Sequence, residues 1–150
     1  RILRQLRHPN IVSLHGAVVD LEQRQVGLVL ELVRGRTLHS FICGEVEGGP
    51  PAAPTLPAPC ARLQVCVGLC SALLYLHSRR PCIVHGDLKS INVLVEGHGE
   101  SARPKLLDFG LARVLSRNAK PLGGTLFWMA PEVYRSKAQP RCSADIFSLG

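Results

Sequence analysis

The spacing of apolar and polar residues divides the chain into segments with different predicted structures. Residues 12–19 and 25–31 predict the two strands of a hairpin, because a polar turn that contains Asp20 and Gln23 separates them. Residues 61–79 predict a helix, because their apolar side chains recur at three- and four-residue spacing, at 63, 66, 67, 70, 73, 74 and 76. Two short strands are predicted at residues 93–96 and 105–107, joined by a turn at 97–99.

The remaining segments are short or have no period. Residues 1–7 predict the last turns of a helix that ends near Pro9, because the residue before a proline is pushed away from helical angles. Residues 35–41 predict a short helix. Residues 44–59 contain five prolines and three glycines and follow neither the helical nor the strand period, so they predict a loop. The mixture of helices and strands predicts the α+β class.

The charge of the chain gives little information about a partner. The formal net charge is +7 at neutral pH, which could indicate an anionic partner. However, Lys and Arg are spread along the chain without a block of five or six like charges, and few aromatic residues lie among them for base stacking. We therefore expect no nucleic-acid partner.

The cysteines favour a reducing compartment. The six cysteines form no Cys-x-x-Cys pair, and Cys66 and Cys70 share one face of the predicted helix, which favours core packing over a zinc site. Reduced thiols predict an intracellular, cytoplasmic setting. The longest nearly apolar stretch, residues 63–76, is shorter than a bilayer span, so no membrane segment is predicted in these residues.

Two runs of residues carry the chemistry. The first is HGDLKSIN at residues 85–92, and the second is DFG at residues 108–110. Phosphoryl transfer from ATP requires a group that receives a proton, a cation beside the moving phosphoryl, and oxygen ligands for Mg²⁺. Asp87 can receive the proton and Lys89 can supply the cation. Asn92 and Asp108 can supply the metal ligands.

Five motifs in this order resemble the catalytic domain of eukaryotic protein kinases of the serine/threonine type. Besides the run at 85–92 with DFG, they are HPNIV at 8–12, LVLELV at 28–33, GGTLFWMAPE at 123–132 and DIFSLG at 145–150. The WMAPE and LKSxN sequence motifs are most similar to those of the tyrosine-kinase-like branch. Lys89 indicates Ser/Thr specificity, since tyrosine-specific relatives usually carry a different residue there.

The resemblance implies a truncated two-lobed kinase fold. Residues 1–33 would be the end of helix αC, a hairpin and the hinge of the upper lobe. Residues 34–150 would be part of the lower lobe, up to the start of helix αF, with the Pro/Gly-rich insert at 44–59. The glycine-rich loop, the strand lysine and its glutamate partner would precede Arg1. We therefore expect the isolated 150-residue chain to be inactive.

The resemblance also implies ATP and Mg²⁺ as cofactors and a protein with a Ser or Thr hydroxyl as substrate. Leu30 would be the gatekeeper, and Leu94 would lie beneath the adenine. The backbones of Glu31 and Val33 would hydrogen-bond the adenine. Thr125 would position Asp87 and Lys89.

The resemblance implies a structural role for His85. Its ring would stack with the apolar side chains of Leu3, Leu14 and Phe109, and Asp145 would anchor this stack.

The sequence departs from the family at Gly86, where most regulated kinases carry Arg. That Arg normally faces a phosphate on the activation segment, so a phosphate on Ser116 or Thr125 would lack its main partner. Two alternatives to an active kinase remain. A pseudokinase or scaffold would keep the fold and bind partners without catalysis. A small-molecule phosphotransferase is disfavoured, because such enzymes lack the Ala-Pro-Glu segment at residues 130–132.

Overall fold

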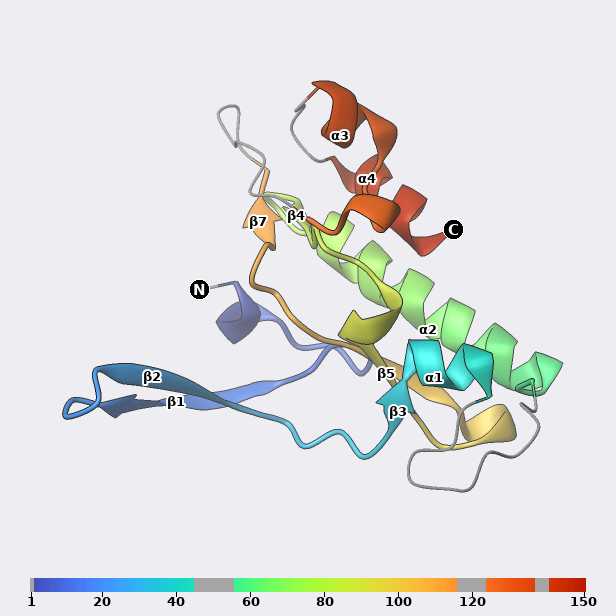
Figure 1. Cartoon of the computed structure of the whole chain (residues 1–150), viewed down its shortest axis with the longest axis horizontal. Helices are drawn as coiled ribbons and strands as arrows, with labels where there is room; N and C mark the ends of the chain where they lie inside the picture. The colour runs from blue at the N-terminus through green and yellow to red at the C-terminus, as the bar shows by residue number, and fades with distance from the viewer. Residues whose placement is uncertain (1, 45–55, 116–123, 137–140) are drawn as a thin grey trace.

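The computed structural model describes residues 2–44, 56–115, 124–136 and 141–150. It confirms the α+β class, with helices and three small antiparallel sheets (Figure 1). The interior of the predicted insert, residues 45–55, and the candidate phosphate site Ser116 lie outside the described residues. The division of the chain into lobes at residues 33 and 34 stays a prediction.

The predicted hairpin is present. Strand β1 (Leu14–Asp20) pairs with β2 (Gln25–Leu30), and the ribbon extends away from the other elements (Figure 1). Its base is attached to the rest of the chain by backbone hydrogen bonds to Leu106, which donates to Asn10 O at 2.8 Å and accepts from Val12 N at 3.0 Å. Asn10 and Val12, just before β1, therefore join the hairpin to the strand that ends at Leu106.

A three-stranded sheet with the order β3-β5-β6 supports the site. It comprises β3 (Arg36–Thr37), β5 (Val93–Glu96) and β6 (Arg103–Leu106), and a 3-10 helix (Gly99–Ser101) lies in the turn between the last two. Helix α1 (Leu38–Cys43) starts later than the predicted 35–41. Arg36 and Thr37 pair with β5 instead, and the Thr37 side chain caps the helix by accepting a hydrogen bond from Ser40 N at 3.1 Å.

The long helix is α2 (Pro59–His77), and among the predicted apolar positions only Leu73 and Leu76 lie on its buried face. Leu63, Val67 and Leu74 are exposed, as are Cys66 and Cys70, so the core-packing interpretation of these two cysteines is wrong. The face toward the core comprises Ala61, Val65, Gly68, Leu69, Ala72, Leu73 and Leu76. Small residues on this face allow close packing on β6: a side chain at position 68 would come within 2.5 Å of Pro104.

Among the described residues, α2 is also the single helix long and apolar enough to cross a membrane. The buried helix of a soluble core has the same length and composition, and one face of α2 packs in this core. The helix is therefore weak evidence for a membrane span.

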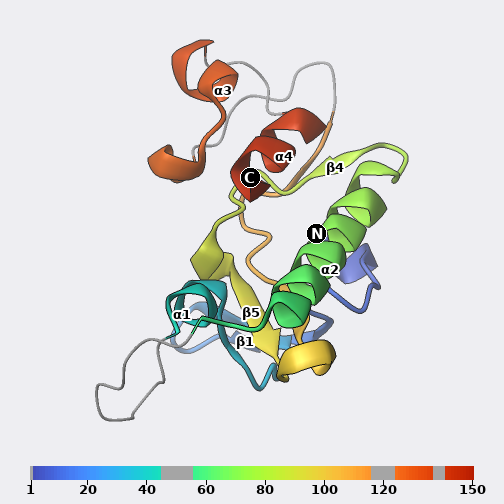
Figure 2. The same cartoon turned by 90° about the vertical axis from the view of Figure 1, so that its right-hand side faces the viewer.

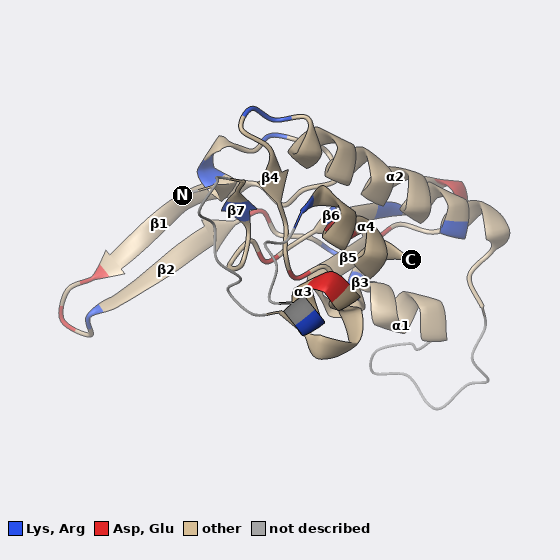
Figure 3. Ribbon diagram, turned by 90° about the horizontal axis from the view of Figure 1, so that it is seen from above, with Lys and Arg blue, Asp and Glu red and all other residues tan. Residues whose placement is uncertain are grey.

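The remaining elements are short, and one of them lies within the loop at residues 85–92. Strand β4 (Ile83–Val84) pairs with β7 (Arg113–Val114) and contacts both α2 and α4 (Cys142–Leu149) (Figure 2). Three short 3-10 helices lie at Leu3–Gln5, Ser90–Asn92 and Leu126–Trp128, and α3 (Pro131–Ser136) follows the last of them. Figure 3 shows the described Lys and Arg residues distributed over several elements.

Candidate active site

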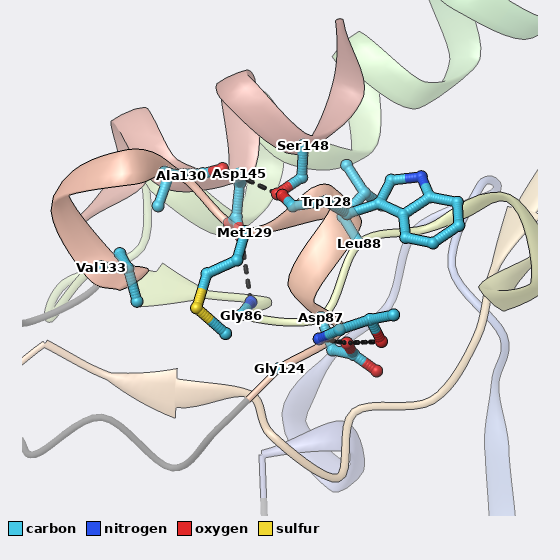
Figure 4. A pocket seen from close by; sticks show the side chains of 12 residues that line it. Gly86, Asp87, Leu88, Gly124, Trp128, Met129, Ala130, Val133, Asp145 and Ser148 are labelled. Carbon is cyan, nitrogen blue, oxygen red and sulfur yellow. Dashed lines mark hydrogen bonds between the residues drawn. The ribbon is translucent and has the colours of Figure 1, made fainter. Parts of the chain in front are cut away.

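The loop after β4 is fastened to α4 by one carboxylate. Asp145 is 1% exposed, and its two oxygens accept hydrogen bonds from the backbone N–H groups of His85 and Gly86, both at 2.9 Å. Figure 4 shows Asp145 beside Gly86. His77 Nε2, from the end of α2, lies 2.9 Å from the same carboxylate. A buried carboxylate needs such partners, and here they fix the start of the loop.

Gly86 has a backbone conformation that suits glycine. Its φ is +77°, in the left-handed region, and a Cβ there would lie 3.2 Å from Leu111 O. The buried Arg113 occupies the space beside it, with one guanidinium nitrogen 3.7 Å from that Cβ position. Burial lowers the pKa of Arg113, although the charge of Asp145 acts in the opposite direction. The departure from the family at position 86 thus has a local structural basis.

His85 lies in the core beneath the site. Its Nε2 donates to Leu107 O at 2.9 Å, which leaves Nδ1 to accept from Asp87 N at 3.4 Å. The ring meets Phe109 edge-on, with centroids 4.9 Å apart. The structure therefore brings His85 together with Phe109 and Asp145, as the resemblance implied. Leu3 packs against the same core, whereas Leu14 lies in the hairpin.

The burial of His85 predicts a pH-dependent stability. Burial lowers the pKa of His85 below its ordinary 6.5, against smaller opposite effects that begin with the hydrogen bond to Leu107. Below about pH 6.5 the unfolded chain therefore binds a proton that the folded chain does not bind. We expect the free energy of unfolding to fall as the pH is lowered from 7.5 to 5.5, by up to about 1.4 kcal/mol per pH unit from this residue.

Urea unfolding at these two pH values checks this expectation. A His85→Gln variant keeps a donor for Leu107 O and removes the titration, so its stability should change less with pH than that of the parent. His39→Gln, at an exposed position, is the control and should keep the parent's pH dependence. An unchanged pH dependence in His85→Gln would contradict the assignment.

Three of the predicted catalytic side chains form one cluster. Lys89 Nζ lies 2.8 Å from Asp87 Oδ2 and 2.9 Å from Thr125 Oγ1. The hydroxyl and the backbone N–H of Thr125 both donate to Asp87 Oδ1, at 2.9 and 3.1 Å. Thr125 comes from a segment 38 positions away, and it therefore holds the carboxylate and the ammonium in a fixed arrangement.

The cluster controls the ionisation of Asp87. Burial raises the pKa of this carboxyl, but the hydrogen bonds from Lys89 and Thr125 and the charge of Lys89 outweigh it, so the pKa lies below its ordinary value. Asp87 is consequently ionised at neutral pH. An ionised carboxylate beside a hydroxyl can orient it and receive its proton during transfer.

Asn92 and Asp108 are placed by adjoining strands. Asn92 immediately precedes β5, and Leu107, next to Asp108, donates its N–H to Asn92 O at 2.8 Å. The Asn92 side chain donates two hydrogen bonds from Nδ2, to Asp87 O at 2.9 Å and to Asp87 Oδ2 at 3.2 Å. Within the described part of the chain, its amide oxygen is therefore left for a cation.

Asp108 lies at a conformation that few non-glycine residues adopt, with a φ of +51°. Its Oδ1 accepts from Gly110 N at 3.1 Å. Among the described residues, no group of three or more His, Cys, Asp or Glu side chains is arranged so that it could hold a metal ion by itself. One carboxylate and one amide oxygen do fit Mg²⁺ that takes its other ligands from phosphate and water.

In the described part of the chain, the residues of the predicted adenine site make fewer hydrogen bonds with one another than the residues of the catalytic cluster. Leu30 ends β2, and Glu31 follows it, with its carboxylate accepting from Ser13 N at 3.0 Å and paired with Lys105 Nζ. Lys105 lies opposite Leu94 in the β5–β6 register, so the pair connects the hinge segment to the strand that carries Leu94. The hydrogen bond from Lys105 is the main cause of the lowered pKa of Glu31. Adenine contacts of these residues and of Val33 stay predictions.

A small pocket lies beside Asp87. It is lined by the loop at residues 86–88, by residues of the segment 124–130, and by α4 (Figure 4). Ser148 Oγ lies 2.6 Å from Trp128 O and joins α4 to that segment. Ser148, Lys105 and His77 support the site but were not predicted. The sequence carries no signal for them, because each acts through a residue at least 20 positions away.

Comparison with known proteins agrees with this geometry. A model of the protein kinase domain matches residues 1–150. Mitogen-activated protein kinase kinase kinase 7 of Drosophila melanogaster is 35% identical over 148 residues, which cover 97% of this chain and 20% of that protein. The G-type lectin S-receptor-like serine/threonine-protein kinase RKS1 of Arabidopsis thaliana is 31% identical over 156 residues, with coverages of 100% and 17%.

The relatives are not all of one stated specificity. The receptor protein-tyrosine kinase CEPR2 of Arabidopsis thaliana is 33% identical over 153 residues, which cover 99% of this chain and 14% of that protein. The chain thus spans a fifth or less of the length of these three relatives. The set fits the tyrosine-kinase-like branch to which the motifs pointed.

Proposed function

Because the chain belongs to the protein kinase family, we propose that the protein transfers the γ-phosphoryl group of ATP to Ser or Thr hydroxyls of protein substrates. The observation that carries this proposal is the cluster of Asp87, Lys89 and Thr125, in which an ionised carboxylate lies 2.8 Å from an ammonium. A carboxylate and a cation at this separation match the two needs of the reaction, a proton acceptor and a positive charge beside the phosphoryl group.

Each residue of the site has a defined part in the proposed reaction. Asp87 orients the acceptor hydroxyl and receives its proton as the phosphoryl group moves. Lys89 stabilises the negative charge that develops on the phosphoryl oxygens. Thr125 keeps both side chains in place through its hydroxyl and its N–H. Asn92 and Asp108 would hold Mg²⁺, which neutralises charge on the phosphates of ATP.

The pocket beside Asp87 supports a protein as acceptor. Its walls include Trp128 and Met129 from the segment that precedes α3, and Ser148 fastens that segment to α4. A fixed surface next to the proton acceptor suits a peptide laid across it. Lys89 favours Ser and Thr as acceptor residues, because tyrosine-specific relatives usually carry a different residue at this position. The pseudokinase alternative is less well supported, because Asp87, Lys89, Asn92 and Asp108 are all present and Asp87 contacts both Lys89 and Asn92.

A phosphorylation assay tests the proposal directly. The purified full-length protein is incubated with γ-labelled ATP, Mg²⁺ and a mixed protein substrate, and it should give label on Ser and Thr in a phosphoamino-acid analysis. Omission of Mg²⁺ with an excess of EDTA should abolish the label. Label on Tyr alone would contradict the Ser/Thr assignment, and no transfer by a folded protein that binds ATP would favour the scaffold alternative.

Gly86 predicts weak control by activation-segment phosphate. The usual Arg partner is absent, so removal of phosphate by a phosphatase, or a Ser116→Ala change, should lower the rate of phosphoryl transfer by less than about tenfold, near 1.4 kcal/mol. The rate of the treated enzyme is compared with that of the untreated parent. A larger loss would indicate that another cation, such as Arg113 beside Gly86, holds the phosphate.

A further inference from the structure

Two cysteines from distant parts of the chain meet behind the active site. Cys82 immediately precedes β4, and Cys142 is the first residue of α4, 60 positions later. Their sulfur atoms lie 2.8 Å apart, and both residues are half-buried. The other four cysteines, Cys43, Cys60, Cys66 and Cys70, are exposed. The pair is therefore distinguished from the rest by both contact and position.

The geometry of the pair is close to that of a disulfide. A disulfide requires about 2.05 Å between the sulfur atoms, so a closing movement of under about 1 Å would suffice. Side-chain rotation can supply a movement of this size. Both backbone segments are held by hydrogen bonds: Cys82 O accepts from Leu115 N at 2.8 Å, and Asp145, one turn after Cys142, accepts from His85 N and Gly86 N.

We propose that Cys82 and Cys142 form an oxidative modification site, at which a low-molecular-weight disulfide such as oxidised glutathione generates a Cys82–Cys142 disulfide. The thiolate of one cysteine attacks one glutathione sulfur and displaces the other as a thiolate, giving a mixed disulfide. The thiolate of the second cysteine then attacks the Sγ of the first and releases the second glutathione. The two cysteine protons end on the two glutathione thiols, the cysteine pair is oxidised, and the glutathione disulfide is reduced.

The surroundings of the two thiols affect the rates of the two steps. Burial raises the pKa of Cys82 to about 12, with further contributions from the neighbouring Cys142 and from the charge of Asp145. A protonated thiol is a poor nucleophile, so the first attack is the slow step. The cysteine that has not attacked glutathione resolves the mixed disulfide. Because the two sulfur atoms are already in contact, this second step is intramolecular and fast relative to escape.

The cross-link would enclose the whole catalytic cluster. The loop between Cys82 and Cys142 contains Asp87, Asn92, Asp108 and Thr125. A disulfide that closes a loop of this length restricts the unfolded chain, and it would join β4 to α4 at a contact that the folded chain already makes. Oxidation should therefore stabilise the folded protein without displacing Asp145.

Peptide mapping tests whether the bond forms. The whole protein is incubated with oxidised glutathione, its free thiols are alkylated in denaturant, and tryptic peptides are analysed by mass spectrometry. We expect residues 80–89 linked to the peptide that begins at Cys142, with the link lost on treatment with dithiothreitol. Glutathione adducts on Cys82 or Cys142 without the link, or a link between other cysteines in its place, would overturn the proposal.

Thermal unfolding tests whether the bond fits the fold. Oxidation should raise the Tm by about 5 °C or more in the parent and in the Cys66→Ser control, but not in Cys82→Ser or Cys142→Ser. A linked protein whose Tm is unchanged or lower would contradict the proposed fit. Both readouts are independent of phosphoryl transfer, so they remain decisive whether or not the proposed kinase activity is found.

Discussion

Replacing Asp108 by Asn in the full-length protein is expected to lower the rate of phosphoryl transfer at least about thousandfold, which corresponds to about 4 kcal/mol of transition-state stabilisation. Asn removes the negative charge that would hold Mg²⁺, while its amide oxygen can still accept from Gly110 N. The loss should therefore lie in metal binding and turnover, with the fold retained. Initial rates over a range of Mg²⁺ concentrations measure it, and the dependence on Mg²⁺ should shift to higher concentrations.

The companion change Asp87→Asn removes the proton acceptor instead. We expect a fall in kcat of about 10² to 10⁴ with little change in the affinity for ATP, because Asp87 acts on the acceptor hydroxyl. Asp20→Asn in the hairpin turn is the matched control, since the amide oxygen can keep the bond to Gln23 N, and its rate should equal that of the parent. Near-parental transfer by Asp108→Asn or Asp87→Asn would contradict the assigned roles.

Asp145→Ala is expected to have the largest effect on stability, a loss of about 3 to 5 kcal/mol in the free energy of unfolding. The change leaves the buried N–H groups of His85 and Gly86 without their acceptor, and each unsatisfied group costs about 1 to 3 kcal/mol. Urea unfolding of the whole protein measures the loss.

Two further variants make the Asp145 experiment interpretable. Asp145→Asn keeps one acceptor oxygen and should fall between the parent and Asp145→Ala, which preserves a measurable protein if the alanine variant does not fold. Glu100→Ala removes an exposed carboxylate and should leave stability within about 0.5 kcal/mol of the parent. An Asp145→Ala protein as stable as Glu100→Ala would show that the loop does not depend on this carboxylate.

The parts of the site that could be predicted are those that lie within short motifs. Asp87, Lys89 and Asn92 share one loop of the sequence, so their proximity follows from the run itself. Thr125 was predicted by resemblance, and the structure brings it to Asp87 and Lys89. Binding of ATP and Mg²⁺ by these residues is tested by the phosphorylation assay and by the Mg²⁺ dependence of the Asp108→Asn variant.

The parts that could not be predicted depend on packing between distant segments. Most of the face of α2 was assigned wrongly, because apolar residues lie on nearly all its sides and the period then does not identify the core face. Gly68 helps to decide it, since a Cβ there would lie 2.5 Å from Pro104 of β6. The start of α1 was also misplaced, although the spacing of Thr37 and Ser40 is a capping signal that could have located it.

The left-handed backbone at position 86 also bears on how the chain could change by mutation. A single substitution of Gly86 by Arg would require an L side chain at a φ of +77°, at a cost of about 1 to 2 kcal/mol, and would place its Cβ close to Leu111 O and beside the guanidinium of Arg113. The contact with Leu111 O, at 3.2 Å, is the tight one, whereas the 3.7 Å to Arg113 is an ordinary van der Waals distance. A return to the usual Arg at this loop would therefore lower stability through the backbone, and a stabilising mutation elsewhere would have to offset that loss.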